Sequence, residues 1–187
     1  MSGGEIVPEK KPLKLKLCLV GESAVGKTCL IRRFVFDQFD DKYIGTLGTK
    51  ISKKPIMIKN HKSEEEKDVN LMIWDIMGQQ GFRQLLQEAY FFGAQGIIGV
   101  CDVTRKNTLS ELENWMDAVH SVTREIPIVF LGNKSDLEDD QEVDIKDIKD
   151  FAARYEKTEI YLSSAKTGHN VELAFKTLGE KILEDIL

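Results

Sequence analysis

The sequence lacks long hydrophobic runs, and no apolar stretch approaches the roughly 18 residues that suggest a membrane span. Cysteine is scarce as well, because Cys18, Cys29 and Cys101 are the only three and lie far apart without metal-ligand spacing. We therefore expect reduced, buried thiols rather than a disulfide or a zinc site. Residues 1–12 lack the apolar core of a secretory signal, and we expect them to form a flexible N-terminal segment.

An excess of positive charge is also missing. The formal net charge is −5, and acidic residues gather at 64–66 and 138–144, where we expect solvated loops. Broad affinity for nucleic acid requires a basic surface, so the composition argues against a nucleic-acid partner. At 42% hydrophobic and 30% charged residues, the 187-residue chain has the composition of one ordinary globular domain, expected over 13–187.

Hydrophobic patterning predicts strands and helices that alternate along most of the chain. This order indicates an α/β fold with a mostly parallel, six-stranded sheet and helices on both faces. In such sheets ligands bind at the carboxyl ends of the strands, so the loops there are the places to look for chemistry. We expect strands at 13–20, 50–59, 68–75, 96–103, 126–132 and 159–163, and helices at 28–36, 82–92, 108–124, 145–157 and 171–186.

The loop after the first expected strand carries a phosphate-binding motif. Residues 21–28 read G-E-S-A-V-G-K-T, a full match to G-x-x-x-x-G-K-[ST] between a strand and a helix. Its backbone N–H groups can surround phosphate oxygens at the positive end of the following helix. Lys27 is then expected to reach the β- and γ-phosphates and the Thr28 hydroxyl to bind Mg²⁺. Taken alone, this phosphate loop would equally suit a nucleotide kinase or an ATPase.

A second loop favours guanine as the base. Residues 133–136 read N-K-S-D, end an apolar strand and follow the phosphate loop by about 105 residues. The carboxylate of Asp136 can accept hydrogen bonds from both N1–H and the exocyclic amine of guanine. Adenine cannot offer that pair and would leave a buried acceptor without a partner, which is costly. The sequence therefore predicts a guanine nucleotide.

Three further segments strengthen this prediction. They read W-D-I-M-G-Q at 74–79, S-S-A-K at 163–166, and Y-F-F-G-A at 90–94 running into I-I-G-V-C-D-V-T at 97–104. With the two loops above, they make the chain resemble the Ras superfamily of small GTPases, and the Rab branch within it. The resemblance covers residues 13–186.

The resemblance implies a residue-by-residue site. Lys27, Thr46 and Gln79 would act in catalysis, with Gln79 orienting the attacking water, and Thr28, Thr46 and Asp75 would hold Mg²⁺. Thr46 follows Thr28 by eighteen residues, the family spacing for a switch threonine. The residues expected to contact GTP or GDP are Ser23, Ala24, Val25, Gly26, Lys27, Thr28, Cys29, Phe39, Thr46, Gly78, Asn133, Lys134, Asp136, Ser164, Ala165 and Lys166.

Several of these roles are specific to one end of the nucleotide. The backbone N–H groups of Thr46 and Gly78 would sense the γ-phosphate, and that of Ala165 would meet the base oxygen. Phe39 would pack against guanine, and the stems of Lys134 and Lys166 would flank its ring system. Read without the resemblance, Thr46 could be a turn residue, Gln79 a helix cap and Phe39 a core aromatic.

The family likeness also implies how such a protein works. No arginine of the phosphate-facing loops offers itself as an internal arginine finger, so we expect slow hydrolysis that an activating protein accelerates. Loss of the γ-phosphate would relax the switch segments 37–51 and 76–92, and effectors and an exchange factor would read the change. Gln80, Met77 and residues 47–51 depart from the family pattern, which leaves the identity of the effectors open.

The end of the sequence lacks a lipid-attachment signal. Residues 184–187 contain no cysteine, and Ser2 rather than glycine follows Met1, so we expect no encoded prenyl or myristoyl anchor. Either a tail is trimmed or the lineage, an archaeal one for example, lacks the anchor. We expect a cytoplasmic monomer that reaches membranes only through partners or through a missing tail.

Three classes of function remain open at this point. The first is an active GTPase switch with GTP as substrate. The second is a GTP-binding scaffold that hydrolyses little or none of its nucleotide. The third is a different phosphate-loop enzyme such as a nucleotide kinase, which would need an acceptor site and an arginine-rich lid that the sequence does not show.

Overall fold

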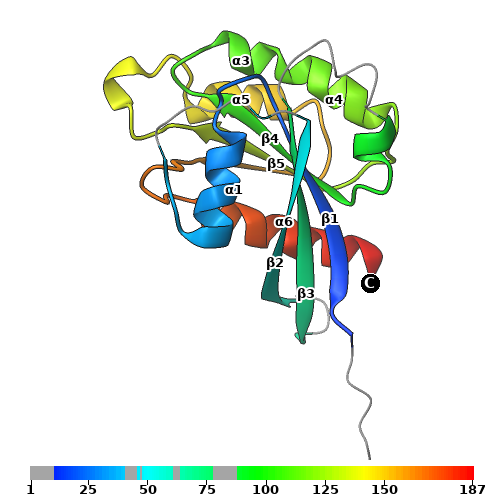
Figure 1. Ribbon diagram of the computed structural model, residues 1–187. Helices are drawn as coiled ribbons and strands as arrows, with labels where there is room; N and C mark the ends of the chain where they lie inside the picture. Colours follow the sequence, from blue (N-terminus) through cyan, green and yellow to red (C-terminus); the bar gives the residue numbers. More distant parts are fainter. Residues whose placement is uncertain (1–10, 41–45, 47, 61–63, 78–87) are drawn as a thin grey trace, which may run out of the picture.

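The computed structural model describes residues 11–40, 46, 48–60, 64–77 and 88–187, and they form an α/β fold around one sheet (Figure 1). The strand order is β2-β3-β1-β4-β5-β6. Only β2 runs antiparallel, against β3, and every other pairing is parallel. The strands are β1 (Leu13–Val20), β2 (Thr49–Lys59), β3 (Glu66–Ile76), β4 (Gly96–Asp102), β5 (Ile128–Asn133) and β6 (Thr158–Leu162).

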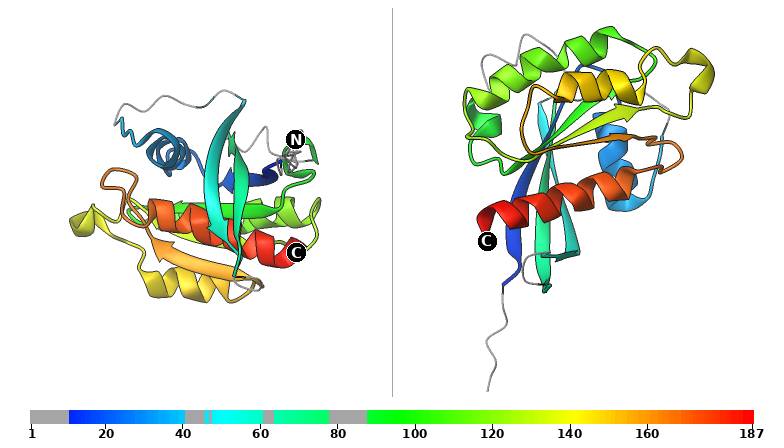
Figure 2. Two further views of the ribbon diagram at one scale, coloured as in Figure 1. Left: turned by 90° about the horizontal axis from the view of Figure 1, so that it is seen from below. Right: turned by 180° about the vertical axis from the view of Figure 1, so that it is seen from behind.

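Helices cover both faces of the sheet (Figure 2). They are α1 (Lys27–Phe36), α3 (Asn107–Ser110), α4 (Leu112–His120), α5 (Ile145–Ala152) and α6 (Val171–Ile186), with a short 3-10 turn η1 (Glu138–Asp140). Helices α1 and α6 pack on one face, and α3, α4 and α5 pack on the other. The mostly parallel six-stranded sheet with helices on both faces is thereby confirmed.

Side-chain alternation divides the core into these two layers. Along β1, Leu15, Leu17 and Leu19 enter the layer beneath α1 and α6, whereas Cys18 and Val20 enter the layer beneath α3, α4 and α5. All five side chains are fully buried. Because successive strand residues point to opposite faces, a central strand covered on both sides must be apolar at nearly every position.

Most expected elements are present with boundaries shifted by a few residues. The helix expected over 108–124 is divided at Glu111 and ends at His120, although the backbone of Glu111 stays helical. The helix expected over 145–157 ends at Ala152, after which the chain turns and Lys157 adopts a positive φ before β6. Of the helix expected over 82–92, only 88–92 are described; residues 88–91 are helical and Phe92 lies in the following turn. Most of the expected N-terminal segment, residues 1–10, lies outside the described residues.

The three cysteines are free thiols, as expected. Cys18 and Cys101 are buried, and burial raises the pKa of each to about 12, so neither forms a reactive thiolate at neutral pH. Cys29 is only half-buried, which corrects the expectation of three buried side chains. It lies on α1, whose other face packs against the sheet. Among the described residues, no helix is long and apolar enough to cross a membrane.

Helices α1 and α6 are joined by an aromatic pair. The rings of Phe34 and Phe175 stack with centroids 4.2 Å apart, and Phe175 is fully buried. This contact fixes α1 on the sheet, and α1 begins directly after the phosphate loop.

We predict that Phe175→Ala lowers the free energy of unfolding by about 3–5 kcal/mol, because it removes the stacked ring and leaves a cavity. Leu173→Ala is the matched control on the same helix, where the side chain is 47% exposed. Urea unfolding of both variants measures the difference. Equal losses in the two variants would contradict this assignment of the core.

Candidate functional site

The phosphate loop has a backbone that only glycine can adopt at two positions. Gly21 has φ of 138°, and a Cβ there would lie 2.2 Å from the carbonyl oxygen of Val100. Gly26 has φ of 103°, and its Cβ would lie 2.3 Å from Nδ2 of Asn133. Ala24 between them also has a positive φ, of 62°. The loop is therefore curled tightly and pressed against the ends of two other strands.

Lys27 lies inside this loop. Its Nζ donates hydrogen bonds to the carbonyl oxygens of Gly21, at 2.6 Å, and Glu22, at 2.8 Å. The side chain is buried, at 6% exposure, so the loop encloses a positive charge at the first residue of α1. A buried ammonium beside a helix N-terminus is suited to bind an anion such as a phosphate.

Three oxygen-bearing side chains meet beside Lys27. Thr28 Oγ1 donates a 2.6 Å hydrogen bond to Asp75 Oδ2 and lies 3.0 Å from Thr46 Oγ1. They come from α1, from the end of β3 and from the segment before β2, and the structure brings together all three residues expected to hold a metal. Hydroxyl and carboxylate oxygens are the ligands that Mg²⁺ prefers.

The environment of Asp75 tests whether a cation fits these residues. It is 2% exposed, and its Oδ1 is buried without a hydrogen-bond partner among the described residues. Burial raises the pKa of this carboxyl, and the hydrogen bond from Thr28 and the charge of Lys27 only partly oppose that effect. Leaving a buried acceptor unpaired is costly, so the residues fit a bound cation. No cluster of three or more His, Cys, Asp or Glu that could hold a metal occurs in the described part of the chain.

Asn133 joins the phosphate loop to the predicted base-binding loops. Its Nδ2 donates to the carbonyl of Val25 at 2.9 Å, and its Oδ1 accepts from Ala165 N at 3.2 Å and from Ser163 Oγ at 3.4 Å. The side chain is therefore fully engaged within the protein. The N–H of Ala165, expected to meet the base oxygen, faces Asn133 and would have to share or exchange that bond.

Asp136 is held in place by the S-S-A-K segment, residues 163–166. Ser164 Oγ donates a 2.6 Å hydrogen bond to Asp136 Oδ1, and Lys166 Nζ lies 4.0 Å from Asp136 Oδ2. Ser164 Oγ in turn accepts from the N–H of Thr167. The structure thus brings the N-K-S-D and S-S-A-K segments together as a single base-side surface, although 28 residues separate Ser164 from Asp136.

The sequence reasoning missed an ion network under this surface. Asp102, fully buried at the end of β4, accepts from Lys134 Nζ at 2.6 Å and from Arg105 Nε at 2.9 Å, while Thr104 donates to its other oxygen. Arg105 also donates to the carbonyl of Ser23 at 3.1 Å. Burial raises the pKa of Asp102, but the hydrogen bonds from Lys134, Thr104 and Arg105 together outweigh it and hold the pKa below its usual value. The sequence did hold one signal for this network, because Asp102 is an acidic residue at the end of an otherwise apolar strand.

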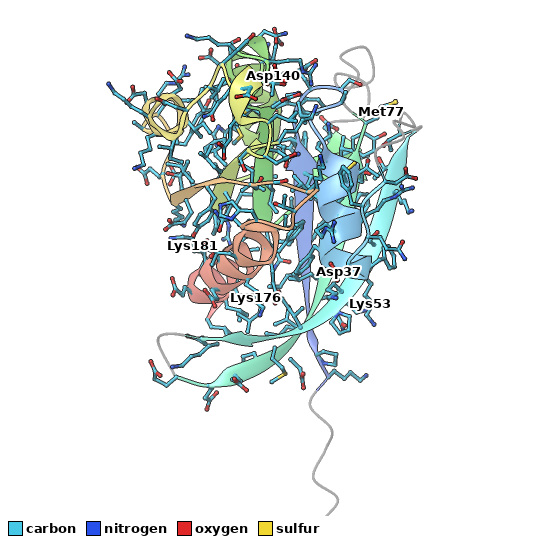
Figure 3. All side chains as sticks on the ribbon, turned by 90° about the vertical axis from the view of Figure 1, so that its left-hand side faces the viewer. Asp37, Lys53, Met77, Asp140, Lys176 and Lys181 are labelled. Atoms are coloured by element: carbon cyan, nitrogen blue, oxygen red, sulfur yellow. The ribbon has the colours of Figure 1, made fainter. Side chains whose placement is uncertain are left out.

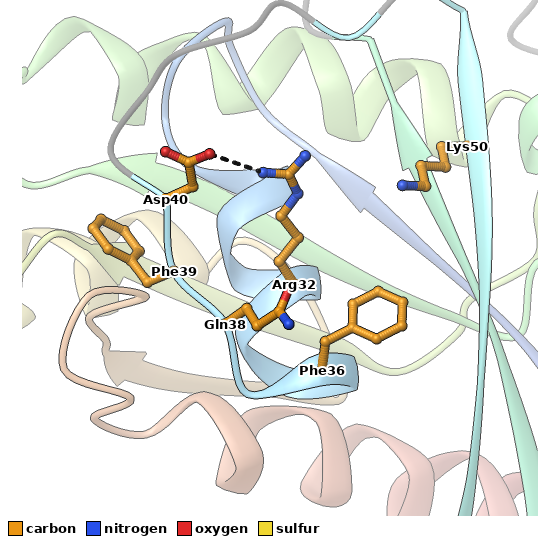
Figure 4. A pocket seen from close by; sticks show the side chains of 6 residues that line it. All are labelled: Arg32, Phe36, Gln38, Phe39, Asp40 and Lys50. Carbon is orange, nitrogen blue, oxygen red and sulfur yellow. Dashed lines mark ion pairs between the residues drawn. The ribbon is translucent and has the colours of Figure 1, made fainter.

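Phe39 is not a core residue, because 38% of its surface is exposed. It lines an open pocket between the end of α1 and β2 (Figure 4), whose lining residues are Arg32, Phe36, Gln38, Phe39, Asp40 and Lys50. Its packing against guanine stays a prediction. Cys29 Sγ lies 3.9 Å from the carbonyl of Asp40, so its side chain faces this same region.

Two expected site residues, Gly78 and Gln79, lie outside the described residues, and their roles remain predictions. Most of the other expected residues gather at the carboxyl ends of β1, β3, β5 and β6, whereas Phe39 and Thr46 lie in the segment between α1 and β2. The fold and this edge together define a phosphate-loop nucleotide-binding protein of the α/β class.

Comparison with known proteins identifies the class more closely. The model of the Ras family matches residues 16–184. Ras-related protein Rab-18-B of Danio rerio is 39% identical over 172 residues, which is 91% of this chain and 80% of that protein. Ras-related protein Rab-13 of Mesocricetus auratus is 37% identical over 90% of this chain and 79% of its own. GTP-binding protein ypt4 of Schizosaccharomyces pombe is 32% identical over 92% and 73%.

The chain therefore belongs to the Ras family and, within it, to the Rab branch. Members of this family are GTPases that bind GTP and GDP. The predicted resemblance and the predicted enzyme class are both confirmed.

We predict that Asp102→Asn lowers the free energy of unfolding at neutral pH by about 2 kcal/mol, since it removes charge-assisted hydrogen bonds whose partners are partly exposed. The folded pKa lies below the unfolded value of about 3.9. The contribution is therefore complete above pH about 4 and is lost as the pH falls through the folded pKa. The difference in the free energy of unfolding between wild type and variant should be constant near neutral pH and should disappear in acid.

Urea unfolding across pH, with GDP in constant excess, measures this difference. Asp140→Asn is the control, because Asp140 is an exposed carboxylate on η1. A difference that stays unchanged into strong acid would show that the charge of Asp102 is not what matters.

Proposed function

We propose that this protein is a Mg²⁺-dependent switch that slowly hydrolyses GTP to GDP and phosphate and changes its switch segments when it does. The observation that supports this best is the meeting of Thr28, Thr46 and Asp75 beside the buried ammonium of Lys27. Those three residues would hold Mg²⁺. The ion, when bound, would neutralise charge on the β- and γ-phosphate oxygens.

The residues of the chain would divide the remaining work by position. The phosphate loop would hold the phosphates through its N–H groups, with Lys27 reaching the β- and γ-phosphates. Asp136, Ala165 and the stems of Lys134 and Lys166 would hold the guanine. Gln79 would orient a water molecule in line with the bond to be broken, so that its oxygen attacks the γ-phosphorus and GDP leaves.

The switching step would depend on Thr46. Its hydroxyl lies 3.0 Å from that of Thr28, which supports a role for this residue of the proposed first switch segment, 37–51, beside the metal. Loss of the γ-phosphate and of the oxygen ligands it supplies would free Thr46 and Gly78, and the segments around them would relax. A changed surface is then what partners would detect.

We assign no described arginine the role of an internal arginine finger. Arg105 is a described arginine that contacts the phosphate loop, but it donates to the carbonyl of Ser23 and is paired with Asp102. Its guanidinium is thus occupied by the protein. Slow unassisted turnover, acceleration by an activating protein, nucleotide loading by an exchange factor and reading by effectors are all part of the proposal. Action as a monomer in the cytoplasm is proposed as well.

We predict that wild-type protein converts bound GTP to GDP at about 10⁻⁴ to 10⁻³ s⁻¹, as expected for a switch without its activator. Gln79→Leu should slow this by at least about tenfold, because the water loses its orienting group. Single-turnover chromatography of the bound nucleotide measures both rates. Gln141→Leu, far along the chain after β5, is the control and should not change the rate.

The same experiment separates the alternatives. GTP retained unchanged by wild type would favour a GTP-binding scaffold. Transfer of the phosphoryl group to an added nucleoside monophosphate, or equal competition by ATP, would favour a nucleotide kinase. Turnover that is unaffected in Gln79→Leu would contradict the assigned role of Gln79.

We predict that Asp75→Asn abolishes the effect of Mg²⁺ on nucleotide release. In wild type, chelating Mg²⁺ should speed GDP release by at least about tenfold, since bound metal stabilises the complex. The variant should release GDP at that fast rate with or without Mg²⁺, because it lacks the anionic ligand. Asp68→Asn is the control on the same strand, where the side chain is exposed.

Release of a fluorescent GDP analogue, followed with and without chelator, tests this assignment. A Mg²⁺ effect that persists in Asp75→Asn would rule out Asp75 as a metal residue. The oxygen of Asp75 that lacks a partner would then need another explanation.

A further inference from the structure

Arg33 connects two parts of the site that lie far apart in sequence. It projects from α1, and its Nε donates to the carbonyl oxygen of Ala165 at 2.9 Å while its Nη2 donates to that of Lys166 at 2.8 Å. The two acceptors lie 132 and 133 residues after Arg33 in the sequence. Its Nη1 pairs with Asp37 at 2.9 Å, so three of its nitrogens are engaged.

The geometry of the guanidinium makes this contact restrictive. Its donors are held in a rigid planar fork, so binding two successive carbonyls fixes both the position and the tilt of the backbone between them. Hydrogen bonds from a charged donor are also stronger than neutral ones. The Arg33 side chain is only 21% exposed, so water competes weakly for these bonds.

Ala165 is consequently held from both sides. Its carbonyl accepts from Arg33, and its N–H donates to Asn133 Oδ1 at 3.2 Å. The N–H of Ala165 is the group expected to meet the oxygen at position 6 of guanine. Removing the Arg33 side chain would deprive the carbonyl oxygens of Ala165 and Lys166 of their cationic donor.

Helix α1 also carries the phosphate-binding residues. Lys27 opens the helix, and Arg33 follows six residues later, about 9 Å along the axis. A rigid helix therefore separates the phosphate-side charge from the group that holds the base-side backbone. The distance between the two halves of the nucleotide site is set by this helix.

We propose that Arg33 is a positioning residue for guanine recognition, which holds the Ala165 N–H at a fixed distance from the phosphate loop so that it meets the base oxygen. This inference rests on the proposed function, because it requires a guanine nucleotide at the site. Arg33 acts through the backbone of Ala165 and Lys166 and does not itself touch the base.

The test compares three diphosphates with wild type and Arg33→Met. GDP and inosine diphosphate carry the oxygen at position 6, and 2-aminopurine riboside diphosphate lacks it. Arg33→Met keeps the aliphatic stem and removes the donors. We expect Arg33→Met to weaken the affinity for GDP and for inosine diphosphate by about tenfold, and the affinity for the 2-aminopurine nucleotide by less than about twofold. Competition against a fluorescent GDP analogue measures all six affinities.

Two further variants sharpen the result. Asp37 lies at the C-terminal end of α1 (Figure 3), where its side chain is 90% exposed. Asp37→Asn removes only its ion pair with Arg33 and should leave all three affinities unchanged. Asparagine tolerates the positive φ of 52° at this position. Arg33→Lys keeps the charge but cannot bind two carbonyls at once, so it should recover only part of the lost affinity.

The outcomes are separable. If Arg33→Met weakened the affinity for all three nucleotides equally, Arg33 would have a general structural role and the proposal would be overturned. Unchanged affinities for all three would also overturn it. Thermal unfolding of the variant identifies loss of the fold as the source of equal weakening. Wild type that binds ADP as well as GDP would instead refute the proposed function, and the role of Arg33 in guanine recognition with it.

Discussion

The amide of Asn133 is a buried side chain that contacts two loops at once. It donates to Val25 in the phosphate loop and accepts from Ala165 in the S-S-A-K segment, and it belongs to the last residue of β5, a fully buried strand. Gly26 must be glycine partly because a Cβ there would collide with this amide. Since neither loop has regular secondary structure, their mutual arrangement depends on side-chain contacts such as this one, and Asn133 is the group that bonds directly to both.

Helix α1 supplies the second constraint, and it does so along its whole length. Lys27 and Thr28 lie at its start, on the proposed phosphate and metal side, Arg33 in its middle bonds to the backbone of Ala165, and Phe34 packs it against α6. The helix would therefore act as a rigid connection between the two ends of a bound nucleotide. A loop in its place could not hold these groups at fixed separations, because its backbone would lack the internal hydrogen bonds that stiffen a helix.

These contacts explain how far the sequence could be interpreted. The placement of Lys27, Thr28 and Asp136 at one edge of the sheet was predictable because each lies in a short motif that follows a strand. The topology followed from strands and helices that alternate in their hydrophobic patterns. Arg33 was not predicted, because its backbone partners lie 132 and 133 residues away and a single arginine on a helix has no distinguishing local pattern. The contact of Asp102 with Lys134, 32 residues away, also depends on tertiary packing, although an acidic residue at the end of an apolar strand was a local signal. The exposure of Phe39 depended likewise on tertiary packing.

Two buried aspartates at the same sheet edge illustrate how a fold can separate structure from function. Asp102 is surrounded by donors that lower its pKa, so its charge stabilises the protein by itself. Asp75 has one oxygen without a hydrogen-bond partner in the described part of the chain, and burial raises its pKa, so its charge by itself destabilises the fold. A cation between Thr28, Thr46 and Asp75 would remove that cost, and occupancy would then stabilise the native state. The stability of this protein should therefore depend on its ligands, which is the property that a nucleotide-controlled switch requires.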